Sequence, residues 1–244
     1  METKMFSIDV PFAKDGGKVI GVNAYSGNKP YLAELSANNM IEWTEKVDGQ
    51  AIVIAYEGEA GDGRIHVYGK TQNASLDAYI QKVADTFKTS AMEEYFEEKF
   101  SRKPYILYAE GISPKNLGKV YGYKDEAKFF LFDVQNAVNG AFWGWQSVKE
   151  VAEATGLNFI GEPFTASIAD VANLLMEQPI RSQFGADGAK VAIEGFVGRA
   201  KYGFRDNNGQ RIITKVKVET LTGHKPEHNK AVIPYEEAVA RFRG

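Results

Sequence analysis

The sequence contains no cysteine, and this absence excludes disulfide bonds and cysteine-based zinc sites. Histidine is scarce as well, since His66, His224 and His228 are the only three and lie too far apart in the chain for a convincing zinc site. Any bound metal is therefore expected to be a hard ion held by carboxylates and phosphates.

Long apolar runs are also missing. No stretch is long enough to span a membrane, and the first ten residues lack the apolar segment of a secretory signal. These absences predict a cytoplasmic protein with no membrane partner. An excess of positive charge is lacking too, because the formal net charge is −3. A nucleic-acid partner would therefore need a local basic surface.

The remaining composition is that of an ordinary soluble protein. The chain has 244 residues, of which 44% are apolar and 25% charged. This length fits one large domain or one domain with a small appendage. We expect residues 1–40 to form an N-terminal extension of short strands and loops, packed on a main domain of residues 41–244.

Hydrophobic periodicity predicts mixed secondary structure. Apolar residues at three- and four-residue steps predict one long helix over 75–100 and two shorter helices, at 146–155 and 168–177. Apolar or alternating runs predict strands at 51–57, 64–70, 105–109, 129–134, 190–197 and 211–219. The fold class is therefore α+β, with mostly antiparallel sheets and helices packed on their faces.

Lys46 occupies an unusual position for a lysine. It stands two residues before the Asp48-Gly49 turn signal in the stretch Trp-Thr-Glu-Lys-Val-Asp-Gly-Gln, and an apolar run that predicts a buried strand follows at 51–56. A lysine at the mouth of a strand can be held against a ligand and used as a nucleophile. The alternative is a surface lysine in a turn that opens a hairpin.

Other charged residues stand at or near the ends of predicted strands. Taken singly each has a structural explanation, such as a turn cap, the start of a loop or the solvated face of a strand. Side chains alternate along a strand, so Lys215 and Lys217 should share one face of theirs. These residues are Glu110, Asp133, Glu194, Lys215 and Lys217.

Together and in this order, the motifs resemble the covalent nucleotidyltransferase superfamily, and its ATP-dependent RNA ligase family in particular. The resemblance covers roughly residues 41–219, and each motif is weak alone. The matching segments are EKVDG at 45–49, HVYGKTQ at 66–72, YAEG at 108–111, FFLFDV at 129–134, IEGFV at 193–197 and ITKVKVE at 213–219.

The resemblance implies an ATP-grasp-like adenylation domain and a role for each matched residue. Lys46 would attack the α-phosphate of ATP and keep AMP, with Mg²⁺ or Mn²⁺ at the phosphates. Asp48 would brace the lysine loop, and Lys215 and Lys217 would act on the phosphate. The implied cofactor-binding set is Glu45, Lys46, Gly49, Lys70, Glu110 (to the ribose), Phe132 (on adenine, with Phe130 as alternative), Glu194, Lys215 and Lys217, and the implied metal ligands are Glu194 and Asp133.

Elementary chemistry explains why a lysine nucleophile needs cationic neighbours. A free lysine amine is neutral in about one molecule in a thousand at pH 7, a penalty of roughly 4–5 kcal/mol. Nearby positive charges lower that penalty, and they also neutralise charge that develops on the phosphate. Lys215, Lys217 and a bound Mg²⁺ are the candidates.

A local excess of positive charge favours a nucleic-acid substrate. Six basic residues lie between Arg199 and Lys217 with the single acid Asp206, and a second group lies between Lys115 and Lys128. They could follow a phosphate backbone, although lysines on solvated strand edges are an equal alternative.

The resemblance implies an enzyme that adenylylates a 5′-phosphate RNA end and seals it to a 3′-hydroxyl. About 25 residues follow Glu219, so we expect no C-terminal OB-fold, and a partner protein could replace that domain. A small ATP-dependent DNA ligase, or a nucleotide-binding module without turnover, are the alternatives.

Overall fold

The computed structural model describes residues 8–23, 25–26, 29–59, 64–230 and 233–243. The chain divides into two compact units. Unit 1 contains Asp48–Lys119 and Tyr123–Ile160, and unit 2 contains Val120–Gly122 and the described residues of 7–47 and 161–244. The chain therefore passes from unit 2 to unit 1 directly after Val47.

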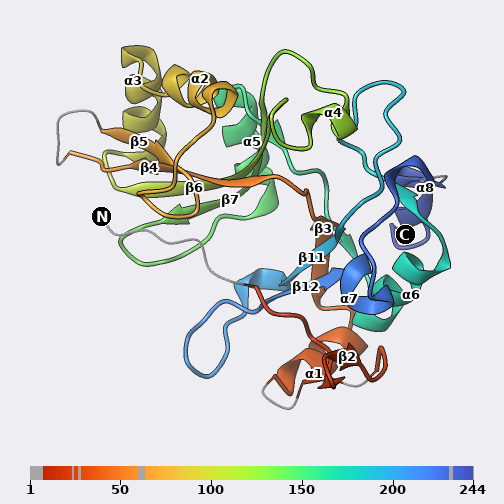
Figure 1. Ribbon diagram of the computed structural model, residues 1–244. Helices are drawn as coiled ribbons and strands as arrows, with labels where there is room; N and C mark the ends of the chain where they lie inside the picture. The colour runs from red at the N-terminus through yellow and green to blue at the C-terminus, as the bar shows by residue number, and fades with distance from the viewer. Residues whose placement is uncertain (1–7, 24, 27–28, 60–63, 231–232, 244) are drawn as a thin grey trace. The chain divides into compact units, whose positions relative to one another are not determined.

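Unit 1 is built on a five-stranded sheet in the order β5-β4-β6-β7-β8, antiparallel except for the β7–β8 pair. Helices α2, α3 and α5 pack on one face of this sheet (Figure 1). The elements are β4 (Gln50–Tyr56), β5 (Ile65–Tyr68), α2 (Ala78–Thr86), α3 (Ser90–Phe100), β6 (Tyr105–Ile112), β7 (Lys128–Asn136), α5 (Trp145–Thr155) and β8 (Asn158–Phe159).

Unit 2 is built on a four-stranded antiparallel sheet in the order β12-β11-β3-β9. The sheet strands are β3 (Ile41–Glu45), β9 (Phe164–Thr165), β11 (Gly195–Ala200) and β12 (Ile213–Lys217). The other elements are β1 (Lys14–Asp15), β2 (Lys18–Val19), α1 (Tyr31–Ala37), α6 (Ile168–Glu177), β10 (Ile180–Arg181), α7 (Val218–Thr222), β13 (Ile233–Pro234) and α8 (Tyr235–Ala240); α4 (Gly118–Tyr121) includes residues of both units.

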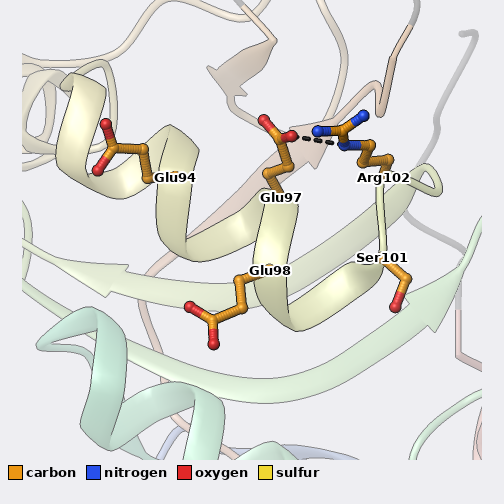
Figure 2. A pocket seen from close by; sticks show the side chains of 5 residues that line it. All are labelled: Glu94, Glu97, Glu98, Ser101 and Arg102. Carbon is orange, nitrogen blue, oxygen red and sulfur yellow. Dashed lines mark ion pairs between the residues drawn. The ribbon is translucent and has the colours of Figure 1, made fainter.

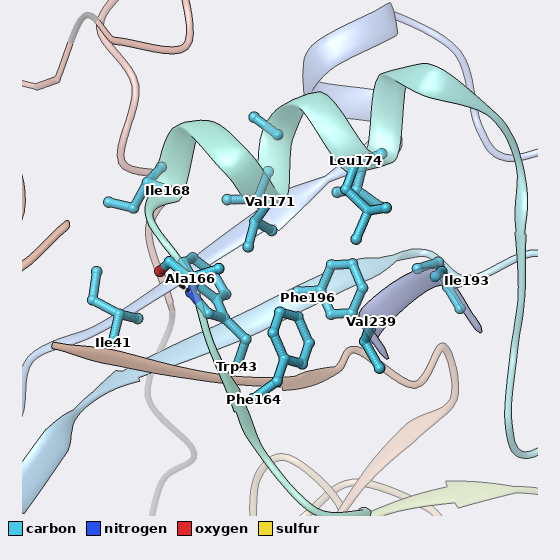
Figure 3. Close-up of a cluster of buried hydrophobic side chains, with 14 of the residues drawn as sticks. Ile41, Trp43, Phe164, Ala166, Ile168, Val171, Leu174, Ile193, Phe196 and Val239 are labelled. Carbon is cyan, nitrogen blue, oxygen red and sulfur yellow. Dashed lines mark hydrogen bonds between the residues drawn. The ribbon is translucent and has the colours of Figure 1, made fainter. Parts of the chain in front are cut away.

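One face of the unit 2 sheet carries the hydrophobic core of that unit, and α6 and α8 cover it (Figure 3). Trp43 lies at its centre, fully buried, and its indole nitrogen donates to the carbonyl of Ala166 at 3.0 Å. Phe196 of β11 packs edge-to-face against Phe164 of β9. This packing fixes which side chains of β3 and β11 can face the other way.

The α+β class with mostly antiparallel sheets is confirmed, and so are the strands predicted at 51–57 and 64–70, which pair as β4 and β5. The single helix predicted over 75–100 is wrong, because two helices stand there. Asp77 caps the first, accepting from the amides of Tyr79 and Ile80, and Thr89 caps the second, accepting from Met92. The extended backbone of Thr89 interrupts the helix that the continuous apolar periodicity suggested.

Other boundaries also differ from the prediction. The strand expected at 190–197 begins only at Gly195, and the strand expected at 211–219 gives way to α7 at Val218. Strand β3 was not predicted, nor was α1, which begins after Pro30 in a region expected to hold strands and loops. Among the described residues, no helix has the length and apolarity needed to cross a membrane.

Candidate active site

Lys46 follows the last residue of β3, where the sheet of unit 2 holds its backbone. The Lys46 amide donates to the carbonyl of Gly195 at 2.9 Å. Gly195 in turn lies opposite Lys217 in the β11–β12 register. A side chain on Gly195 would collide with the backbone carbonyl of Val216, so glycine is required where these strands approach. The segments containing Lys46, Glu194 and Lys217 are therefore brought together by sheet pairing.

The side chains of these segments form one charged cluster. The Glu194 carboxylate, only 9% exposed, accepts from the Lys46 ammonium through Oε2 and pairs through Oε1 with Lys217 Nζ at 2.6 Å. Lys217 also pairs with Glu219 at 3.3 Å. We call Lys46, Glu194, Lys215, Lys217 and Glu219 the lysine cluster. It contains three cations and two carboxylates, and therefore suits an anionic ligand.

The two lysines of β12 have different environments. Burial, followed by the positive charges of Lys46 and Lys217, lowers the pKa of Lys215. Burial also opposes the charged form of Lys217, but its hydrogen bond and ion pair with Glu194, and then Glu219, outweigh burial and raise its pKa. Lys217 is therefore a fixed positive charge, whereas Lys215 is held at a site that disfavours its charge.

Glu45 lies on the opposite side of β3 from the lysine cluster. It shares the core-facing side with Ile41 and Trp43, because strand side chains alternate. Its carboxylate accepts from the hydroxyl of Ser182 and, at 3.1 Å, from the amide of Gln183. Burial raises the pKa of Glu45 to about 7, partly offset by these hydrogen bonds.

The Glu45 side chain thus binds the segment after β10 to the strand that ends at Lys46. Sequence reasoning assigned it to the cofactor, and that contact stays a prediction. The contacts of Glu45 with Ser182 and Gln183 were missed, because neither Ser182 nor Gln183 belongs to a motif. The alternation of Ile41, Trp43 and Glu45 was the signal that could have found it.

In unit 1, Gly49 and Glu110 lie together. The Gly49 amide donates to Glu110 Oε1 at 3.0 Å. A Cβ atom on Gly49 would stand 2.6 Å from the carbonyl oxygen of Gly111. The turn at Asp48 and Gly49 therefore needs glycine for its backbone to approach β6 this closely. Glu110 therefore anchors the turn, whereas its predicted hydrogen bond to a ribose stays a prediction, as does the bracing role of the half-buried Asp48.

Phe132 occupies a β-bulge in β7. Tyr108 pairs with Asp133 and Ala109 with Leu131, which leaves Phe132 as the extra residue. Bulges redirect side chains and are common beside active sites. Phe132 is partly exposed and packs on the second face of the sheet, whereas the alternative adenine platform, Phe130, is buried. The structure therefore leaves Phe132 as the more accessible ring.

The predicted metal ligands belong to different units, Glu194 to unit 2 and the buried Asp133 to unit 1. No group of three or more His, Asp or Glu residues suited to a metal occurs in the described part of the chain. Mg²⁺ commonly binds through one or two carboxylates together with substrate phosphates and water. Glu194 is a single carboxylate whose oxygens pair with Lys46 and Lys217, and the metal-binding roles of Glu194 and Asp133 stay predictions.

The basic residues separate by exposure. Arg199 is buried and donates to the Thr44 hydroxyl at 3.1 Å, so it cannot serve as a surface cation. Lys201, Arg205 and Arg211 are partly or fully exposed in the turn between β11 and β12. In unit 1 the predicted cofactor residue Lys70 is exposed, and so are Lys115, Lys119 and Lys124.

An open hollow of about 500 Å³ lies in unit 1 beside the end of α3 (Figure 2). Three glutamates of α3, Ser101 and Arg102 line it, and Arg102 Nε pairs with Glu97 Oε1 at 2.5 Å. This lining repels phosphates. We therefore place the candidate active site at the lysine cluster and not at this hollow.

A model of the RNA ligase family matches residues 40–217. No curated protein matches the sequence.

Solved structures of Naegleria gruberi RNA ligase share the fold. The form with pyrophosphate is 18% identical, with a TM-score of 0.52 over 76% of this chain and 53% of that one. Two variants, one with ATP and Mn and one with AMP and Mn, are 16% identical over 89% of this chain, with TM-scores of 0.55 and 0.56. This chain covers 62% and 61% of theirs, so it spans less than two thirds of these solved relatives.

Proposed function

This chain belongs to the RNA ligase family, and from that premise we propose that it joins RNA ends at the expense of ATP. In the first step Lys46 Nζ attacks the α-phosphorus of ATP, forming a phosphorus–nitrogen bond and releasing pyrophosphate. The 5′-phosphate of an RNA end then displaces the lysine and takes over AMP. Finally a 3′-hydroxyl attacks that phosphate, which seals the strand and releases AMP.

The lysine cluster is the observation that carries this proposal. Three lysine side chains from two separate segments converge around one nearly buried carboxylate. If the cluster only stabilised the fold, one lysine would be enough to pair with Glu194. Two further lysines beside it would be disfavoured by charge repulsion. An α-phosphate beside Lys46 would compensate the extra positive charge, which supports a phosphate-binding role.

Glu194 and the two β12 lysines place opposite charges beside Lys46. The Glu194 carboxylate holds Lys46 Nζ in a hydrogen bond, and this nitrogen must be free to attack phosphorus. We infer that attack requires Lys46 to leave Glu194, whose carboxylate then stays paired with Lys217. A divalent ion on Glu194 would supply charge neutralisation at the phosphates.

The experiment that tests the proposal is self-adenylylation. Purified protein incubated with labelled ATP and Mg²⁺ should gain one AMP, stable to denaturing electrophoresis and mapped to Lys46 by mass spectrometry. Lys46→Ala should not become labelled, whereas Lys82→Ala, which removes an exposed lysine of α2, is the matched control for loss of a cation. AMP on another lysine, or labelling that persists in Lys46→Ala, contradicts the assignment.

Two alternatives make different predictions. A small DNA ligase would seal a nicked DNA duplex better than the matched RNA, and a ligation assay on both substrates separates these cases. A nucleotide-binding module would bind ATP without covalent labelling. The joint presence of Lys46, Glu110, Glu194, Lys215 and Lys217 favours an active enzyme, because a module without turnover needs no nucleophile. A partner protein in substrate binding remains a prediction.

A further inference from the structure

Two aromatic side chains are exposed in the turn that joins β11 to β12. Tyr202 is 83% exposed and Phe204 is 45% exposed. Their rings lie edge-to-face with centroids 6.0 Å apart. Single exposed apolar residues are common on protein surfaces, but an adjacent aromatic pair at the tip of a strand connection exposes a contiguous apolar surface.

This turn is held by specific hydrogen bonds and is not a loose connection. The Asp206 carboxylate accepts from the amides of Asn208 and Gln210 at 2.9 and 2.8 Å. The Arg205 guanidinium donates to the carbonyl of Gly209 at 2.8 Å. Tyr202 adopts a left-handed backbone, with φ of 56°, which costs about 1 kcal/mol for a bulky residue. The fold therefore presents Tyr202 outward despite a local conformational cost.

Cations accompany the two rings. Lys201 and Arg205 are their neighbours in sequence, and Arg211 pairs with Arg205 across the turn, which places both arginine side chains on the same side of the ribbon. The single acid of the turn, Asp206, is engaged with backbone amides. The tip of the turn thus combines aromatic faces with net positive charge.

The same row of side chains leads along β12 to the lysine cluster. Side chains alternate in a strand, so Arg211, Ile213, Lys215 and Lys217 share one side. The buried side chains of Ile212, Thr214 and Val216 between them agree with this alternation. Arg211 stands four residues from Lys215, which corresponds to about 13 Å along an extended strand. Positive charge therefore extends from the candidate phosphate site toward the exposed rings within unit 2.

We propose that the segment Lys201–Arg211, here called the aromatic turn, binds a single-stranded part of the RNA substrate. A base stacks on Tyr202 or Phe204, and neighbouring phosphates contact Lys201, Arg205 and Arg211. Stacking accepts any base, because every base has a π face, so the contact would grip the strand without reading its sequence. This inference rests on the proposed function and specifies how the same enzyme holds its substrate.

Charge favours RNA over an apolar protein partner. The buried centre of a protein interface is depleted of charged residues such as lysine, whereas here three cations flank two rings. Aromatic rings combined with a positively charged groove are the usual means of binding single strands. If these rings bound a protein instead, removing them would leave the affinity for RNA unchanged. The experiment below includes that outcome.

The test measures binding of a fluorescent, 5′-phosphorylated single-stranded oligoribonucleotide by anisotropy, over a series of salt concentrations and without ATP. The double variant Tyr202→Ala with Phe204→Ala should bind at least about fivefold more weakly at every salt concentration, since stacking contributes about 1–3 kcal/mol per base. Arg205→Ala and Arg211→Ala should instead reduce the slope of log affinity against log salt. Tyr202→Phe, which keeps the ring, should bind like the unmodified protein.

Two controls separate this inference from the proposed function. Tyr79→Ala removes a partly exposed aromatic of α2 and should leave RNA affinity unchanged. Self-adenylylation of the double variant should equal that of the unmodified protein, because the rings lie outside the lysine cluster. RNA affinity that is unchanged in the double variant overturns the inference while leaving adenylylation intact. Failure of adenylylation in the unmodified protein, with RNA binding still sensitive to the rings, rejects the ligase and keeps the RNA contact.

Discussion

The sheets of the two units differ in the side chains that their two faces carry. The five-stranded sheet of unit 1 carries hydrophobic clusters on both faces, because Ile52 and Ile54 of β4 face the helices while Val53 and Ala55 pack with Tyr108 on the other side. The hydrophobic core of unit 2 lies on one face of its four-stranded sheet. The other face carries Lys215 and Lys217, and Lys46 follows β3 on the same side.

This difference separates residues that support the fold from residues available for chemistry. In a sheet packed on both faces, the side chains stabilise the fold. The half-buried lysines around one carboxylate in unit 2 are instead electrostatically unfavourable for the folded state. Glu45 and Lys46 are neighbours in sequence, but Glu45 supports the fold and Lys46 lies in the lysine cluster. Substituting Glu45 should therefore affect stability, and substituting the lysines should affect activity.

The largest expected effect concerns Glu45 and pH. Burial raises its pKa from 4.5 to about 7 in the folded protein, so between these values the folded chain keeps a proton that the unfolded chain releases. Stability should therefore decrease as pH rises from about 4.5 to about 7, by roughly 3 kcal/mol in total, and then level off. Denaturant unfolding at several pH values measures this decrease.

Glu45→Gln provides the comparison, because it keeps the shape of the side chain and does not titrate. Relative to this variant, the unmodified protein should lose stability across the same pH window. Glu98→Gln, on the exposed surface of α3, should keep the pH dependence of the unmodified protein. If Glu45→Gln and the unmodified protein show parallel stability curves, the buried carboxylate does not titrate in this range.

A smaller effect is expected from the two lysines of β12. Lys215→Ala and Lys217→Ala should each slow self-adenylylation at least about tenfold, equivalent to roughly 1.4 kcal/mol in the barrier, with little change in melting temperature. Both lysines belong to the charged face and neither contributes to the apolar core. Lys201→Ala is the matched control on the same sheet connection. Normal adenylylation in both variants would make these residues the solvated side of an amphipathic strand.

Much of the fold could be predicted because long periodic segments determine their own structure. The apolar runs of β4, β6 and β7 and the periodic helices α5 and α6 stand where they were expected. Short elements could not be predicted in the same way. Helix α1 has seven residues, and β3 has five in which Glu45 interrupts the apolar pattern. Capping by Thr89 divides α2 from α3 without any break in periodicity.

The candidate site was partly predictable for a similar reason. Motif order identified Lys46, Glu194 and Lys217, which the structure joins by ion pairs. Motifs do not show which side of a strand a residue takes, and for that reason the buried Arg199 was grouped with a basic surface and the core-facing side chain of Glu45 was not foreseen. The exposed rings of the aromatic turn were missed because aromatic residues in a sequence usually indicate core.

The smallest expected effect is a difference in salt sensitivity between the two chemical steps. If RNA binds through the exposed cations of the aromatic turn, as we propose, binding releases counterions, and sealing of a 5′-phosphorylated RNA by preadenylylated enzyme should weaken steeply with salt. Adenylylation, proposed to occur at the half-buried lysine cluster where screening is weaker, should decline less. Measuring both steps over one salt series tests this order, and the equivalent DNA substrate should be joined poorly. Efficient DNA joining would favour the DNA ligase, whereas equal salt dependence of both steps would mean that the exposed cations do not hold the substrate.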